Sequence, residues 1–167
     1  MLGVRKLVTA TAAVLAIAVG AAVPHAVNAQ EKTAFSYPIQ KTEDRVAIDG
    51  YDLVAYFKKK EAMKGNPEHA VEYGDTIYYF ASRSHQNAFL KHPTKYLPRF
   101  GGFCPVNLGD GKAVEGNPKE FTIRDGQLYL CASGEAKQAF EGEPKKIVHK
   151  AEQNAPEVLR ARGQRGR

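Results

Sequence analysis

The chain has 167 residues, of which 43% are hydrophobic and 25% are charged. This composition is ordinary for a globular protein and argues against a disordered chain, a collagen-like repeat and a polytopic membrane protein. The formal net charge of +6 comes from the two ends, because Arg5 and Lys6 lie near the start and four arginines lie in the last eight residues. The body between them carries as many cations as acids. We therefore expect no nucleic acid as the partner.

The first 29 residues have the features of a secretory signal peptide. Two cations precede an apolar run at residues 7–23, and the small residues Val27–Ala29 offer a cleavage site before Gln30. We expect a leader at residues 1–29, no membrane span once it is removed, and a bacterial protein of the periplasm or the extracellular space. A leader retained as a membrane anchor is the alternative.

A flexible linker is expected at residues 30–45, before a single domain at residues 46–150. The domain opens with GYDLVAYF at residues 50–57, in which apolar and polar side chains alternate as in a short, half-buried strand. Asp52 could cap or turn the chain there. Alternatively, Asp52 and Tyr56 could face a ligand.

The rest of the domain contains an internal repeat. Residues 62–97 match residues 113–148 at 11 of 36 positions without a gap, and each stretch contains a GNP triplet that we interpret as a turn. With one residue of slip the match extends upstream, so that residues 50–56 lie against residues 102–108. The pseudo-repeats therefore span about residues 50–97 and 102–148.

Each copy is predicted to be a β-hairpin followed by a helix. The expected strands are residues 71–73 and 76–80 in the first copy, and residues 121–124 and 127–131 in the second. One such half is marginal by itself, so we expect the two halves to share a core.

The helices have clear start and stop signals. Ser82 or Ser84 can cap the first helix and Ser133 the second, and Pro93 and Pro144 should end them. Phe89 and Phe140, which match in the repeat, are expected in the shared core. The residues after these helices, 151–167, are expected to form a loosely held basic tail.

These residues resemble the YHS domain family. The stretch YGDTIYYFASRSHQNAFLKHPTKYL at residues 73–97 looks like a YHS domain, and GYDLVAYF together with FGGFC at residues 100–104 looks like the secreted bacterial YHS-domain proteins. The resemblance covers residues 46–150 and implies a small α+β fold of treble-clef-like type. It also implies binding of a transition metal, with Cys104 in the family's CPV turn and His85 at a position where the family has a cysteine. Cys131, one residue before the family's cysteine position, is the third candidate ligand, and copper or zinc is the expected metal.

Cys104 and Cys131 are the only cysteines, and three interpretations of them stay open. They could form a disulfide, they could be buried free thiols that act as small apolar side chains, or they could be thiolate ligands of Cu(I) or Zn(II). A catalytic pair of Cys104 and His85 has no third group at a suitable spacing, so we expect no enzyme.

The sequence thus predicts a binding module whose partner is a metal ion or a small ligand. The alternative is a disulfide-stapled structural, interaction or small-ligand domain that binds no metal.

Overall fold

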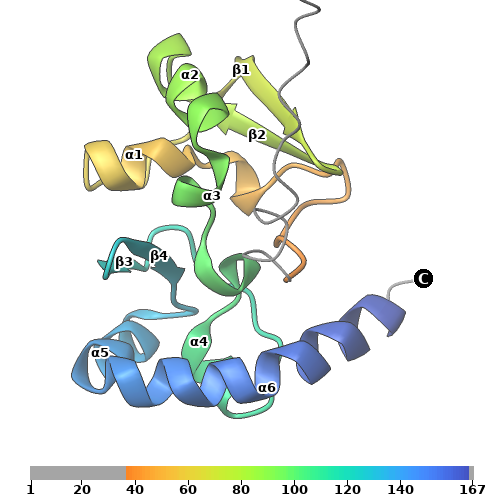
Figure 1. Cartoon of the computed structure of the whole chain (residues 1–167), viewed down its shortest axis with the longest axis vertical. Helices are drawn as coiled ribbons and strands as arrows, with labels where there is room; N and C mark the ends of the chain where they lie inside the picture. The colour runs from red at the N-terminus through yellow and green to blue at the C-terminus, as the bar shows by residue number, and fades with distance from the viewer. Residues whose placement is uncertain (1–36, 166–167) are drawn as a thin grey trace, which may run out of the picture.

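The computed structural model describes residues 37–165 of the chain (Figure 1). Within these residues the protein is α+β, with helices around two separate two-stranded antiparallel sheets. The expected leader at residues 1–29 and the first part of the expected linker lie outside the described residues. None of the helices in the described part of the chain combines the length and the apolar character that a membrane span needs.

Two units with the same order of elements follow one another along the chain, and they lie above and below each other in Figure 1. The N-terminal unit consists of the 3-10 helix η2 (Ile48–Gly50), α1 (Leu53–Lys58), β1 (Asn66–Tyr73), β2 (Thr76–Phe80), α2 (Arg83–Lys91) and α3 (Pro93–Tyr96). The C-terminal unit consists of η3 (Arg99–Gly102), α4 (Pro105–Gly109), β3 (Phe121–Arg124), β4 (Gln127–Leu130), α5 (Gly134–Gly142) and α6 (Pro144–Arg165).

The repeat in the sequence is also a repeat of backbone geometry. Each unit opens with three consecutive residues of positive φ, residues 48–50 and residues 100–102. Matching backbone hydrogen bonds then close the two opening segments: Asp52 N to Met63 O and Cys104 N to Val114 O, and Gly65 N to Gly50 O and Gly116 N to Gly102 O. The two copies therefore have one local fold.

The predicted hairpins and helix boundaries are confirmed. β1 pairs with β2 and β3 pairs with β4, each across a two-residue turn. Ser82 and Ser133 cap α2 and α5 by accepting hydrogen bonds from backbone N–H groups three residues later. Pro93 and Pro144 lie just beyond these helices and begin the next ones, α3 and α6.

The strand predicted within residues 50–57 is wrong, because these residues form α1 instead. Asp52 caps this helix by accepting hydrogen bonds from the N–H groups of Val54 and Ala55. Residues 53–56 are all fully buried. Four consecutive buried residues leave this short helix without a polar face until Lys58 at its end, so its sequence lacks the helical period that would have identified it.

The shared core is in fact two cores that share one strand. Phe89 packs in the core of the N-terminal unit and Phe140 in that of the C-terminal unit. Strand β4 connects them, because Leu128 and Leu130 belong to the first core and Tyr129 belongs to the second. The alternation of side chains along a strand thus places one hairpin between the units.

The segments expected to be loose are packed in their described parts. Gln40, within the expected linker, is buried, and its side-chain amide both donates to and accepts from the backbone of Gly116. The expected tail is the C-terminal part of α6, where Ala151, Ala155 and Leu159 are buried. Both segments were expected to be loose because they are mostly polar. A few buried apolar or amide side chains are nevertheless enough to hold each of them against the rest of the protein.

Candidate functional site

A buried carboxylate and an imidazole form the first polar cluster. The Asp52 side chain is fully buried, and its Oδ1 accepts hydrogen bonds from the N–H groups of Val54 at 2.8 Å and Ala55 at 3.2 Å. Its Oδ2 accepts from Ala81 N at 2.8 Å and from His85 Nδ1 at 2.6 Å. One carboxylate therefore joins the start of α1, the end of β2 and the first turn of α2, and it fixes the orientation of the His85 ring.

A thiol pair forms the second polar cluster. Cys104 and Cys131 are both free and fully buried. Both lie in the buried cluster of the C-terminal unit. The interaction with the Cys131 thiol is the main cause that lowers the pKa of Cys104 to about 6, and the backbone N–H groups of Asn107, Ala132 and Val106 lower it further, although burial acts in the opposite direction. The same interaction and burial raise the pKa of Cys131.

The two clusters are equivalent under the internal repeat. Asp52 and Cys104 take matching places in the opening turns, 52 residues apart. Asp52 accepts hydrogen bonds from three backbone N–H groups, and three backbone N–H groups lower the pKa of Cys104. The donors also match in pairs: Val54 with Val106, Ala55 with Asn107, and Ala81 with Ala132. We call this set of three N–H groups the amide cradle. Only the side-chain partner differs, since it is His85 in one unit and Cys131 in the other.

The metal and disulfide predictions are wrong for this structure. The predicted ligands Cys104, Cys131 and His85 do not form one cluster, because His85 pairs with Asp52 and the cysteines pair with each other. Among residues 37–165 no three His, Cys, Asp or Glu side chains are grouped as a metal site would require. The cysteines remain thiols, as the interpretation of buried free cysteines had it.

The predicted ligand-binding pair of Asp52 and Tyr56 is internal. Tyr56 is fully buried, and its hydroxyl donates to the carbonyl oxygen of Pro118 at 2.9 Å. Its ring lies 4.7 Å from that of Phe121, measured between centroids, and burial raises the pKa of its hydroxyl. Tyr56 thus joins α1 to the C-terminal unit, which is a structural role.

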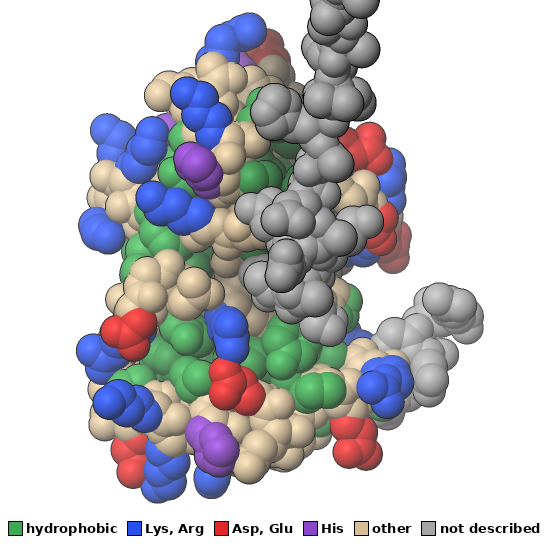
Figure 2. Space-filling model, in the orientation of Figure 1, with side chains coloured by type: hydrophobic (Ala, Val, Ile, Leu, Met, Phe, Trp, Pro, Cys, Tyr) green, Lys and Arg blue, Asp and Glu red, His purple; other side chains and the backbone are tan. Residues whose placement is uncertain are grey.

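A basic pocket on the N-terminal unit was not predicted from the sequence. This pocket, about 570 Å³ in volume, lies between α1, α2 and α3. Its charged lining residues are Lys58, Arg83 and Lys91, with His92 beside them and no carboxylate among the residues that line it. Figure 2 shows Lys and Arg side chains on this side of the upper unit, whereas most of its Asp and Glu side chains lie along the other edge. We call it the basic pocket.

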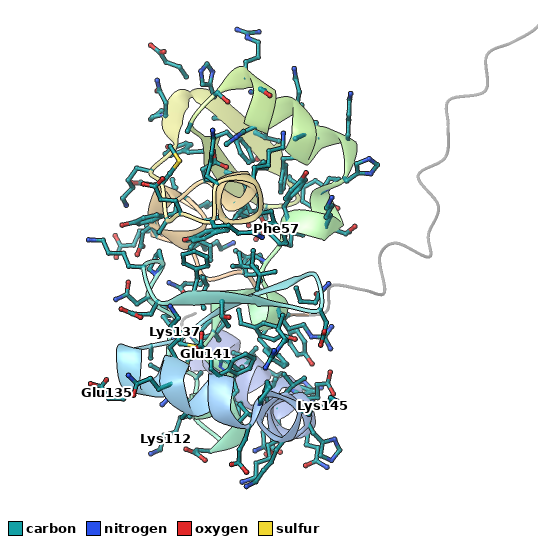
Figure 3. The ribbon with its side chains drawn as sticks, turned by 90° about the vertical axis from the view of Figure 1, so that its left-hand side faces the viewer. Phe57, Lys112, Glu135, Lys137, Glu141 and Lys145 are labelled. Carbon is teal, nitrogen blue, oxygen red and sulfur yellow. The ribbon has the colours of Figure 1, made fainter. Side chains whose placement is uncertain are left out.

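A signal for this pocket exists in the sequence. Residues 76–109 contain no Asp or Glu, and α2 and α3 lie within them. A charge count over the whole body hides this stretch, because the acids elsewhere balance it. The C-terminal unit has no comparable separation of charge: Glu135, Lys137 and Glu141 alternate along α5 (Figure 3).

A second pocket, of about 560 Å³, confirms the contrast. It lies between the β3–β4 turn and the start of α6, and its lining includes Asp125 and Glu143 beside Arg124 and Lys145. Charges of both signs in one site cancel much of the field on a ligand. The basic pocket is therefore the stronger candidate for a charged ligand.

Comparisons with known proteins add no family or function. No protein-family model, no curated protein and no solved structure matches the chain. The resemblance to the YHS family thus stays a prediction from the motifs.

Proposed function

We propose that this protein is a two-unit binding module of the YHS type that holds a small anionic ligand in the basic pocket. The observation that carries the proposal is the lining of this pocket, which has three permanent cations and no carboxylate. The YHS motifs at residues 50–57, 73–97 and 100–104 support the family assignment. Export from the cytoplasm stays a prediction from residues 1–29.

The ligand we propose carries phosphate or carboxylate groups. Arginine presents a planar fork of donors that matches either group, and lysine adds a point charge. None of Lys58, Arg83 and Lys91 forms an ion pair with another of the described residues. Their charges are therefore free to act on a ligand.

The helix geometry supports one shared binding face. Arg83, Asn87 and Lys91 are spaced four residues apart on α2, so they lie along one side of the helix. His85 is on the buried side, where it is held by Asp52, which also caps α1. The buried pair thus sets the position of α2 relative to α1, from which Lys58 completes the pocket.

Calorimetric titration with pyrophosphate and with citrate at constant ionic strength tests this function. We expect saturable binding that weakens as salt is raised, because exposed charges are screened. The double variant Arg83→Glu with Lys91→Glu should lose at least tenfold in affinity. Lys119→Glu with Lys150→Glu changes the net charge equally but lies outside the pocket, and it should bind like the wild type.

Two results would contradict the proposal. One is the absence of saturable binding of either anion to the folded wild type. The other is an equal loss of affinity in the two double variants, because that would show a response to net charge and not to the basic pocket.

A further inference from the structure

The pocket between the β3–β4 turn and the start of α6 contains a polar group without a partner among the described residues. Tyr129 lines this pocket although only 6% of its surface is exposed. Its hydroxyl hydrogen-bonds none of the other described residues, whereas the buried hydroxyl of Tyr56 donates to Pro118. A buried tyrosine hydroxyl usually has a hydrogen-bond partner. A molecule bound in the pocket would supply the partner that Tyr129 lacks.

The charges around this hydroxyl are of both signs. Glu143 is paired with Lys146, whose Nζ lies 2.9 Å from each of its carboxylate oxygens. Arg124, Lys145 and Asp125 also line the pocket, and they form no ion pair with another of the described residues. Within the described chain, the pocket therefore offers a ligand two unpaired cations and one unpaired carboxylate.

The local structure holds these groups in place. Asp125 and Gly126 both have positive φ, 52° and 74°, as in the two-residue turns that suit the twist of a hairpin. Pro144 begins the 22-residue helix α6, so Lys145 and Lys146 belong to its first turn (Lys145 is labelled in Figure 3). Backbone N–H groups in a first turn lack a partner within the helix and favour a negative charge. The pocket thus has an anion-binding end at α6.

We propose that this pocket, which we call the mixed pocket, binds a small zwitterion with an apolar body, of the class of the free apolar amino acids. The ligand carboxylate binds at the start of α6, where Lys145, Arg124 and the Tyr129 hydroxyl can donate to it. The ligand ammonium binds the carboxylate of Asp125. The proposal is independent of the basic pocket, since the two lie in different units.

The lining of the mixed pocket sets the class of ligand. Charges of both signs weaken the attraction of a ligand with a net charge, but a zwitterion places each of its charges beside an opposite one. Pro144 and Val148 add apolar lining for the rest of the ligand. The volume of about 560 Å³ is within the range of sites for small molecules.

An NMR titration of the folded full-length protein with L-phenylalanine tests the proposal. Three compounds each lack one feature of this probe: hydrocinnamate lacks the ammonium, phenethylamine lacks the carboxylate, and glycine lacks the apolar body. L-Phenylalanine should shift the amide signals of residues 124–126 and 143–148 in a saturable way. It should bind about tenfold more tightly than each of the three, because each of them loses one charged or apolar contact.

Two variants assign the contacts. Asp125→Asn removes the charge, and asparagine tolerates the positive φ at this position. It should weaken L-phenylalanine about tenfold but should not weaken hydrocinnamate, which has no ammonium. Tyr129→Phe removes only a hydroxyl, so it should weaken L-phenylalanine about threefold and leave the protein folded. Asp110→Asn, at an exposed site of the same unit outside the pocket, should bind like the wild type.

The proposal is wrong if L-phenylalanine causes no saturable shifts in the folded wild type, or if hydrocinnamate or phenethylamine binds as tightly. Equal affinities of Asp125→Asn and Asp110→Asn would also overturn it. Shifts confined to residues 83–91 would overturn it as well, because they would place the amino acid in the basic pocket.

Discussion

The Asp52 carboxylate and the Cys104 thiol occupy equivalent places in the two units: three backbone N–H groups donate hydrogen bonds to Asp52, and those at matching positions lower the pKa of Cys104. The two units thus share the same three backbone N–H positions but differ in the side chain that they surround, Asp52 or Cys104, and in its partner, His85 or Cys131. In the N-terminal unit the result is a fixed link between α1 and α2. In the C-terminal unit it is a polarised thiol pair.

The link at Asp52 should be essential for stability. Asp52→Ala removes the acceptor of three backbone N–H groups and leaves His85 without its partner. Breaking a buried, hydrogen-bonded pair costs about 3–5 kcal/mol. Urea denaturation should show this loss, whereas Asp44→Ala, at an exposed site, should stay within about 0.5 kcal/mol of the wild type. A similar small loss for Asp52→Ala would contradict the structural role.

An exchange of acceptors tests the equivalence of the two sites. We expect Cys104→Asp to be more stable than Cys104→Val at neutral pH, because only aspartate can accept hydrogen bonds from the amide cradle. Each buried donor that loses its partner costs about 1–3 kcal/mol. If the cavity were simply apolar, valine would be the better replacement, and the order of unfolding free energies would be reversed.

The thiol pair also gives a pH dependence of known sign. The pKa of Cys104 is lowered to about 6 from an ordinary 9.0, so at intermediate pH the unfolded chain binds more protons than the folded one. The free energy of unfolding should therefore rise between pH 6 and 9, by at most about 1.4 kcal/mol per pH unit from this group. This stabilisation is lost as the pH falls through about 6, the pKa of Cys104 in the folded protein.

The difference between the wild type and Cys104→Ser isolates this contribution in denaturation curves. Above pH 9 the sign reverses, because the raised pKa of Cys131 keeps a proton on the folded protein that the unfolded chain releases. A difference that does not change between pH 6 and 9 would contradict the ionised form of Cys104.

Two glycines are required by close backbone contacts and not by turn geometry. A Cβ on Gly65 would lie 2.3 Å from the carbonyl carbon of Tyr79, and one on Gly116 would lie 2.4 Å from the Cβ of Leu130. Gly65→Ala and Gly116→Ala should each cost about 1–3 kcal/mol or more through overpacking. Gly134→Ala is the control, since nothing lies within 4 Å of its added Cβ. Thermal unfolding of the three variants gives the comparison.

Much of the local structure could be predicted, because its signals are local. Turn residues, serine caps and prolines identified both hairpins and the ends of α2 and α5. The matched positions in the repeat also identified Phe89 and Phe140 as buried. α1 was missed because its first four residues are all buried and give no amphipathic period, and Asp52 at its start was the one signal that favoured a helix.

The site could be predicted only in part, because its partners are distant in the chain. Asp52 and His85, and the two cysteines, were selected as chemically important residues, but their pairing depends on contacts across 33 residues in the first case. The alignment of Asp52 with Cys104 was present in the repeat. The reason for this alignment could not be predicted from the sequence, because the amide cradle consists of backbone N–H groups, which every residue except proline has. The basic pocket was hidden by a charge count over the whole body.

The most direct test of the account is a titration of thiolate ultraviolet absorbance against pH in the folded, reduced wild type. If Cys104 is the anionic counterpart of Asp52, one equivalent of thiolate should appear with a midpoint near pH 6 and vanish in Cys104→Ser, while Cys131 should show no ionisation below pH 9. Two thiols that titrate together near the ordinary value would contradict it.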